Sequence, residues 1–125
     1  MKKVTIIIFL VLTMSSCYKT ISIDGFDKEK WVNNLTACSS YRNDISTLLL
    51  DNEGVILKST QNEVESLLGK ASEHELYERN QKFFHYRLSP PDSCGQEETL
   101  KYLSIRFNAM GRANQVQVML REANK

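Results

Sequence analysis

The sequence has little charge imbalance and few of the residues that build metal sites. Its formal net charge is +1 over 125 residues, and the charge becomes −1 without Lys2 and Lys3. A near-neutral chain lacks the basic surface that binds nucleic acid, and the sequence has no polybasic run to hold it on anionic lipid. It has three cysteines and two histidines but no CxxC pair. We therefore expect no nucleic-acid partner, no metal site and no cofactor.

The sequence also lacks an apolar run long enough to cross a membrane. A spanning helix needs about 20 apolar residues. The apolar run at residues 4–14 is shorter than that, and two threonines interrupt it. Two lysines precede the run and Ser15-Ser16-Cys17 follows it, which is typical of a secretory signal.

The cysteine directly after the small residues makes this segment similar to a lipoprotein signal. In such signals the cysteine is lipidated and becomes the first residue of the mature protein. We therefore expect residues 1–16 to be a signal peptide and Cys17 to carry palmitate. A plain secretory signal and a retained membrane anchor are the alternatives.

The two remaining cysteines, Cys38 and Cys94, are 56 positions apart. Disulfides persist outside the cytoplasm, and two cysteines allow one pairing. We favour a bridge between them over two buried free thiols. His74 and His85 lie near neither cysteine in sequence, which argues against a shared metal site.

Two helices are predicted after a tether at residues 17–26. The first covers residues 27–50, where apolar residues at helical spacing form one face. These are Trp31, Leu35, Cys38, Ile45 and Leu49, with Arg42 on the same stripe. Asp27 can cap its start, and Gly54 is suited to end it. Cys38 is expected to be buried.

The second helix begins with a capping box, in which the Thr60 hydroxyl and Glu63 satisfy backbone N–H groups. Val64, Leu67 and Leu68 form its apolar face, and Gly69 stops it. Residues 55–57 are expected to be a short apolar link.

Four segments then alternate with a period of two, which predicts strands. They cover residues 73–79, 82–88, 100–107 and 116–120. Pro90 and Pro91 interrupt the sheet because proline cannot donate to a strand ladder. The sequence predicts an α+β domain at residues 27–125, with two helices on one face of a three- to four-stranded antiparallel sheet.

The outward-facing positions of this sheet are a candidate protein-binding surface. Helices on the Phe84 and Leu103 side would leave five residues of the other side in solvent: Phe83, His85, Arg87, Tyr102 and Arg106. Exposed aromatic and arginine residues are common in interfaces. The alternative is a half-covered sheet with ordinary surface aromatics.

The catalytic candidates have simpler structural explanations, and we predict no catalytic residue. His85 lies between aromatics and is expected to pack across strands, since no acid or nucleophile accompanies it in a recognisable pattern. His74 is expected on a solvated edge. Glu63 and Glu65 suit the first turns of a helix, and Cys94 suits a disulfide better than a reactive thiol.

Residues 55–120 resemble the SmpA/OmlA (BamE-like) family of small outer-membrane lipoproteins. The similar pieces are Ser59-Thr60-Gln61-Asn62-Glu63-Val64, Leu67-Leu68-Gly69-Lys70, Phe83-Phe84-His85-Tyr86, Leu103-Ser104-Ile105-Arg106-Phe107-Asn108 and Gly111-Arg112. Ser59 and Ala71 stand where the family typically has glycine and proline. The earlier helix resembles that of a subset of uncharacterised lipoproteins.

The resemblance implies a non-catalytic role, because family members of known role assist outer-membrane protein insertion or bind protein partners. We expect a lipid-anchored protein of the outer membrane, facing the periplasm, with an envelope protein as partner. Tyr18, rather than an aspartate, follows Cys17, and this mildly favours the outer membrane. A periplasmic inhibitor or ligand-binding module is the alternative function, and an enzyme is less favoured.

Overall fold

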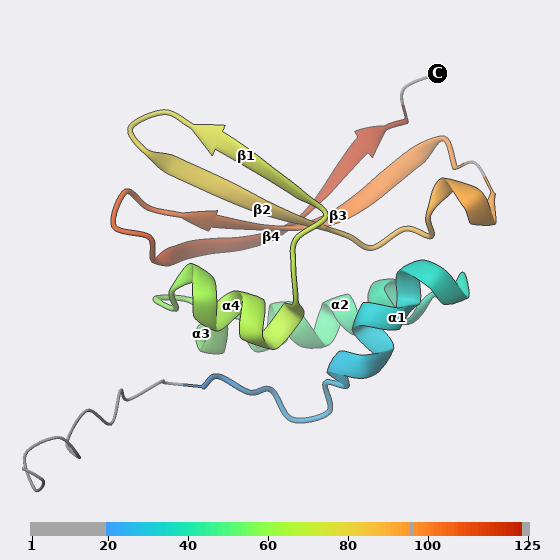
Figure 1. The fold of residues 1–125 in the computed structure, drawn as a ribbon, viewed down its shortest axis with the longest axis horizontal. Coiled ribbons are helices and arrows are strands. Elements are labelled where there is room, and N and C mark those ends of the chain that lie inside the picture. Colours follow the sequence, from blue (N-terminus) through green and yellow to red (C-terminus); the bar gives the residue numbers. More distant parts are fainter. Residues whose placement is uncertain (1–19, 96, 124–125) are drawn as a thin grey trace, which may run out of the picture.

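The chain folds into a sheet lying over a layer of helices (Figure 1). The computed structural model describes residues 20–95 and 97–123, except for the side chains at positions 35–37. The helices are α1 (Lys28–Ala37), α2 (Tyr41–Asp51), α3 (Glu53–Ile56) and α4 (Gln61–Leu68). The strands are β1 (Glu73–Tyr77), β2 (Gln81–Arg87), β3 (Thr99–Phe107) and β4 (Ala113–Glu122), and a 3-10 turn, η2 (Asp92–Cys94), lies between β2 and β3. The predicted signal peptide, Cys17 and Tyr18 lie outside the described residues.

The α+β class and the antiparallel sheet are confirmed. The four strands are hydrogen-bonded in sequence order, β1-β2-β3-β4, and each neighbouring pair is antiparallel. The β1–β2 turn contains Arg79 and Asn80 at positive φ, and Gly111 lies in the β3–β4 turn with φ 78°. The β1–β2 and β3–β4 connections are short local turns, whereas residues 88–98 join β2 to β3 through a longer loop that holds η2. The alternating sequence pattern was nevertheless sufficient to predict this antiparallel sheet.

The prediction of one long helix over residues 27–50 was wrong. Asp27 caps α1 as expected, since its carboxylate accepts a hydrogen bond from the Lys30 backbone N–H at 3.2 Å. The helix then ends at Cys38, which adopts a left-handed conformation with φ 51°, and α2 begins after Ser40. Cys38 is exposed at this corner rather than buried. The side chain of Leu35, also placed on the predicted stripe, is outside the described residues.

Two smaller predictions on the helices had opposite outcomes. Thr60 caps α4 by accepting from the Glu63 backbone N–H at 3.2 Å, and Gly69 ends that helix with φ 74°, as predicted. Gly54 was expected to end the preceding helix in a left-handed conformation, but it lies inside the short helix α3. Of residues 55–57, expected to be a link, Val55 and Ile56 belong to α3 and Leu57 caps its end, and Ile56 is buried in the core.

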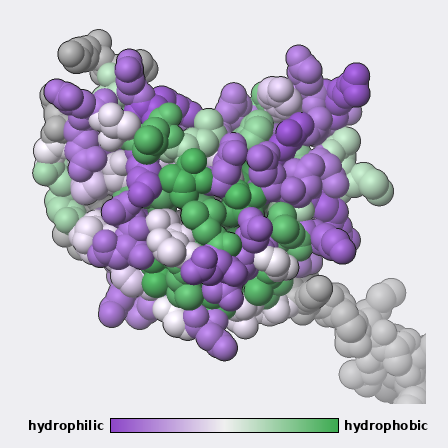
Figure 2. All heavy atoms as spheres, turned by 180° about the vertical axis from the view of Figure 1, so that it is seen from behind, coloured by the Kyte–Doolittle hydropathy of each residue, from purple (hydrophilic) through white to green (hydrophobic). Residues whose placement is uncertain are grey.

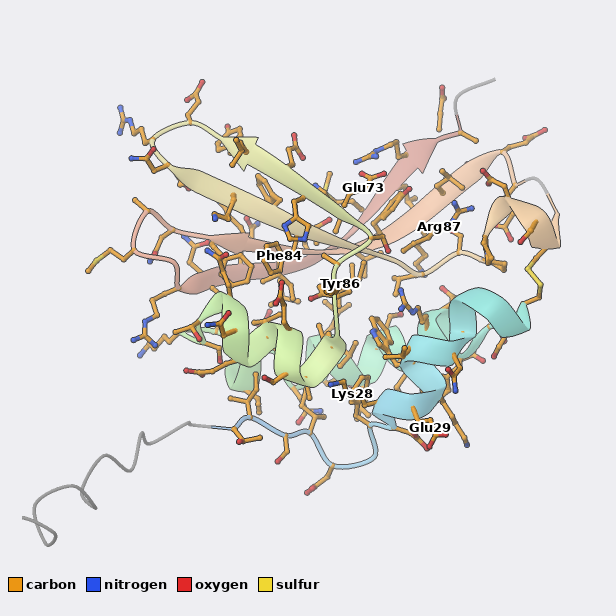
Figure 3. All side chains as sticks on the ribbon, in the orientation of Figure 1. Lys28, Glu29, Glu73, Phe84, Tyr86 and Arg87 are labelled. Carbon is orange, nitrogen blue, oxygen red and sulfur yellow. A yellow bond between two sulfur atoms is a disulfide. The ribbon has the colours of Figure 1, made fainter. Side chains whose placement is uncertain are left out.

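The core lies between the helices and one face of the sheet. Phe84, Tyr86 and Leu88 from β2 and its end point into it, as the alternation predicted, and Figure 3 shows Phe84 and Tyr86 between the two layers. Trp31 closes the core from α1, where its indole N–H donates to the Leu68 carbonyl at 2.8 Å. Seen from behind, the hydrophobic surface gathers in the middle of the molecule and hydrophilic side chains surround it (Figure 2).

The segment before α1 belongs to the core. Ile21 and Ile23 are buried with the core residues, and Phe26 packs against Trp31 with ring centroids 5.7 Å apart. The sequence placed these positions in the tether of residues 17–26. Within the described chain, only Thr20 is therefore left as a tether.

Cys38 and Cys94 form a disulfide, as predicted, with their Cα atoms 5.6 Å apart. The bridge joins the corner between α1 and α2 to η2, and so connects the helix layer to the β2–β3 loop. Figure 3 shows it as the yellow bond at the edge of the fold.

Candidate functional site

The five predicted binding residues lie on the sheet face opposite the helices. Strand register pairs Phe83 with Arg106, His85 with Ser104, and Arg87 with Tyr102. The structure therefore brings these residues together on adjacent strands, as the alternation predicted.

Their predicted exposure to solvent was wrong for His85 and Tyr102. His85 is 1% exposed and Tyr102 is 4% exposed, although none of the helices that the structure describes covers this face (Figure 1). The Arg121 guanidinium lies 4.9 Å from the Tyr102 ring and forms an ion pair with Glu73 at 2.9 Å. This ion pair joins the two edge strands, β4 and β1, and so covers the middle of the face.

His85 is the centre of a short hydrogen-bond chain across three strands. Its Nε2 lies 2.8 Å from Glu75 Oε2 on β1, and its Nδ1 lies 2.6 Å from Ser104 Oγ on β3. The Phe83 ring stacks beside the imidazole with centroids 5.6 Å apart. Because a carboxylate only accepts, Nε2 donates to Glu75 and Ser104 can donate to Nδ1.

A serine, a histidine and a carboxylate in a row are also the parts of a nucleophilic triad. Here, however, the Ser104 side chain is buried at 1% exposure, and His85 uses Nδ1 rather than Nε2 to contact it. A triad nucleophile must be reached by substrate and have oxyanion donors beside it. The chain of contacts therefore fits a buried polar network that joins β1, β2 and β3.

Arg106 and Phe83 form an aromatic–cation cluster with a residue that the sequence reasoning missed. The Arg106 guanidinium lies 5.3 Å from the Tyr77 ring and 5.9 Å from the Phe83 ring. Tyr77 and Phe83 meet edge-on with centroids 5.6 Å apart. Arg106 Nε also donates to Gln81 Oε1 at 2.7 Å, which fixes the guanidinium in place.

Arg87, the fifth predicted residue, forms hydrogen bonds that hold a loop in place. Its Nη2 donates to the Pro90 carbonyl at 2.7 Å and to Asp92 at 3.0 Å. These bonds hold the β2–β3 loop beside the disulfide. Arg87 shares the sheet face with the cluster of Tyr77, Phe83 and Arg106 but lies at the other end of β2.

A groove of about 550 Å³ opens next to this cluster, where the β1–β2 and β3–β4 turns approach α4. We call it the hairpin-end groove. Leu76 and Met110 line it and are 85% and 88% exposed. Its other lining residues are Gln61, Tyr77, Asn80, Gln81, Lys82, Asn108, Ala109 and Gly111. No pattern in the sequence predicts this groove, because it depends on two turns that meet in space.

The remaining catalytic candidates have local contacts. His74 packs its ring 4.4 Å from Phe84, and the Glu63 backbone takes part in the α4 cap. Cys94 is used in the disulfide. No group of three potential metal ligands occurs among the residues that the structure describes.

Two buried groups have shifted pKa values at the junction of the layers. Burial lowers the pKa of Arg42 to about 10. Burial also raises the pKa of Tyr86, and the nearby Glu65 adds to that rise. The Tyr86 hydroxyl donates to the Gly69 carbonyl at 2.9 Å, so both groups serve packing between helices and sheet.

Comparison with known proteins gives no assignment. No protein-family model, curated protein or solved structure matches the chain. Within residues 20–95 and 97–123, no helix has the length and apolar character to span a membrane.

Proposed function

We propose that this chain is a lipid-anchored protein of the cell envelope that binds another protein and performs no catalysis. The resemblance of residues 55–120 to the SmpA/OmlA (BamE-like) family supports a role in assembly at the outer membrane, on the periplasmic side. The hairpin-end groove, together with the cluster of Tyr77, Phe83 and Arg106, is its proposed binding surface.

The exposed apolar side chains of Leu76 and Met110 carry this proposal. Both line one groove and are more than four-fifths exposed. An aromatic–arginine cluster continues the surface through Tyr77 and Gln81. Apolar, aromatic and arginine groups next to one another are the composition of interface hot spots.

The charges around the groove indicate the chemistry of the partner. Among the residues that the structure describes, Lys82 lines the groove and no carboxylate does, while Arg106 lies beside it. Amide side chains supply most of the remaining polar groups. The surface therefore suits a protein segment that presents apolar side chains next to an acidic residue.

The cysteine pairing supports lipidation of the third cysteine. Cys38 and Cys94 pair with each other, so Cys17, which follows the apolar leader, is the cysteine left over for another chemistry. We expect palmitate labelling of the native protein to be lost in Cys17→Ala. Retained label would contradict the proposed anchor.

The binding proposal is tested by envelope crosslinking with a photoreactive amino acid at Gln61, which lines the groove. Leu76→Asp and Met110→Asp should each weaken capture of the same partner by more than about tenfold, the effect of a hot spot of about 2 kcal/mol. Leu120→Asp is the matched control, because Leu120 is 69% exposed but lies on β4, outside the groove.

The outcomes separate the candidate functions. Equal capture by all three variants would contradict the groove as the binding surface. An outer-membrane assembly complex as the captured partner supports the first role, whereas a soluble enzyme supports a periplasmic inhibitor instead.

A further inference from the structure

The folded domain begins very close to the proposed lipid attachment site. Ile21 and Ile23 are buried in the core, and Gly25 lies against Leu48 of α2, where an added Cβ would be 3.5 Å from Leu48 Cδ2. Only four residue steps separate Cys17 from Ile21. Fully extended, that length of chain spans at most about 14 Å.

This attachment lies on one side of the fold. Figure 1 shows the described start of the chain running along the helix layer, on the side away from the sheet. Figure 3 shows Glu29 projecting from α1 on that same side. A helix layer and a sheet together are about 20 Å thick, so the outer face of the sheet is farther from the attachment site than the tether can reach.

We infer that the helix layer faces the lipid headgroups and that the outer face of the sheet points away from the membrane. This inference rests on the lipidation of Cys17 proposed above. It places the cluster of Tyr77, Phe83 and Arg106 on the side open to a partner, while the side of Asp24 and Glu29 lies against the bilayer surface.

The orienting force is the short tether rather than charge. Near the attachment site, the two lysines Lys28 and Lys30 are outnumbered by three carboxylates, those of Asp24, Asp27 and Glu29. Lys28 Nζ also donates to the Ser66 carbonyl at 2.9 Å. A surface that carries charges of both signs is attracted only weakly to anionic lipid headgroups. The orientation should therefore persist at high salt, where surface electrostatics are screened.

The experiment uses the lipidated protein in vesicles of phosphatidylethanolamine and phosphatidylglycerol that contain a nitroxide-headgroup lipid. A fluorescent amino acid replaces either Glu29 or Gln115, which avoids adding a thiol near the disulfide. Gln115 is exposed and pairs with Arg106 on the outer face. We expect strong loss of fluorescence at Glu29 and none at Gln115, in low and high salt.

A linker variant provides the internal control. A Gly/Ser insertion of about 16 residues before Thr20 has a root-mean-square length of about 22 Å, and it should abolish the difference between the two positions. Equal quenching at both positions without the insertion overturns the orientation alone. A protein that does not float with the vesicles overturns the lipid anchor, and the orientation with it.

Discussion

The Arg42 guanidinium lies over the Trp31 ring, with its central carbon 4.5 Å from the ring centroid. Arg42 Nε donates to the Trp31 carbonyl at 2.8 Å, and Nη1 donates to the Arg87 carbonyl at 3.0 Å. A single side chain of α2 thus joins α1 to the end of β2. In the described part of the chain no carboxylate forms an ion pair with Arg42, so carbonyl oxygens and the indole face stabilise its charge.

Replacing Arg42 with methionine should destabilise the protein strongly. Arg42→Met keeps much of the side-chain volume but leaves two carbonyl groups without their donor and removes the contact with the indole. We expect the free energy of unfolding to fall by about 2–4 kcal/mol, measured by urea denaturation. Lys30→Met, at an exposed position of α1, is the control and should change the free energy of unfolding by less than about 0.5 kcal/mol. Similar losses for both variants would contradict the role of Arg42.

Removing the disulfide should also destabilise the fold. The bridge closes a separation of 56 residues, for which the chain-entropy model gives about 4 kcal/mol. The variant with both Cys38→Ala and Cys94→Ala should unfold at lower urea, and a reductant should shift the wild type but leave this variant unchanged. Under non-reducing conditions the wild type should have a mass two hydrogens below its dithiol form. Two alkylatable thiols in the native protein would contradict the pairing.

Local signals in the sequence predicted the features that depend on neighbouring residues. The α4 cap at Thr60, its end at Gly69 and the alternation of β2 and β3 are all read within a few positions. The break at Cys38 is different, because Trp31 and Leu49 keep helical spacing on both sides of it. That corner is fixed by the Arg42 contacts and the disulfide, which join segments distant in sequence.

The exposure of the sheet face could not be read from alternation. Period-two spacing assigned His85 and Tyr102 correctly to the face opposite the helices. Tyr102 lies under Arg121, whose ion pair with Glu73 reaches from one edge strand to the other. His85 is enclosed by Glu75, Phe83 and Tyr102. These contacts depend on the twist of the whole sheet. The groove at Leu76 and Met110 was also missed, because it forms only where the β1–β2 and β3–β4 turns come together in space.

The partners of His85 predict its tautomer. Glu75 can only accept from Nε2, so neutral His85 should carry its proton on Nε2 and accept the Ser104 hydroxyl hydrogen at Nδ1. Two-bond nitrogen–proton correlation spectra of the ring will show which nitrogen is protonated. Ser104→Ala leaves a buried ring nitrogen unpaired and should cost about 1–3 kcal/mol. Glu75→Gln should lower the free energy of unfolding by less than Ser104→Ala does, because the Glu75 side chain is exposed. A proton on Nδ1 in the neutral ring would contradict the assignment.

Tyr86 should make the protein less stable at alkaline pH. Its ordinary pKa is 10.0 and burial raises the value in the folded state, so above pH 10 the folded state keeps a proton that the unfolded state has lost. Stability from this group is therefore complete below pH 10 and falls as the pH rises beyond it, by up to about 1.4 kcal/mol per pH unit. Arg42 acts in the opposite direction, because its pKa is lowered from 12.5 to about 10 in the folded state. Between these two values the unfolded state keeps a proton that the folded state has lost, so the contribution of Arg42 to the free energy of unfolding rises with pH.

The two effects are separated by comparing variants across the alkaline range. Tyr86→Phe loses the hydrogen bond to Gly69 and should be less stable than the wild type near neutral pH by about 1 kcal/mol, but the difference should shrink above pH 10 because the phenol no longer titrates. Arg42→Met should show the reverse, with a steeper alkaline fall than the wild type. Urea denaturation at a series of pH values measures both slopes. If Tyr86→Phe stayed parallel to the wild type above pH 10, the buried phenol would not be the source of the alkaline loss.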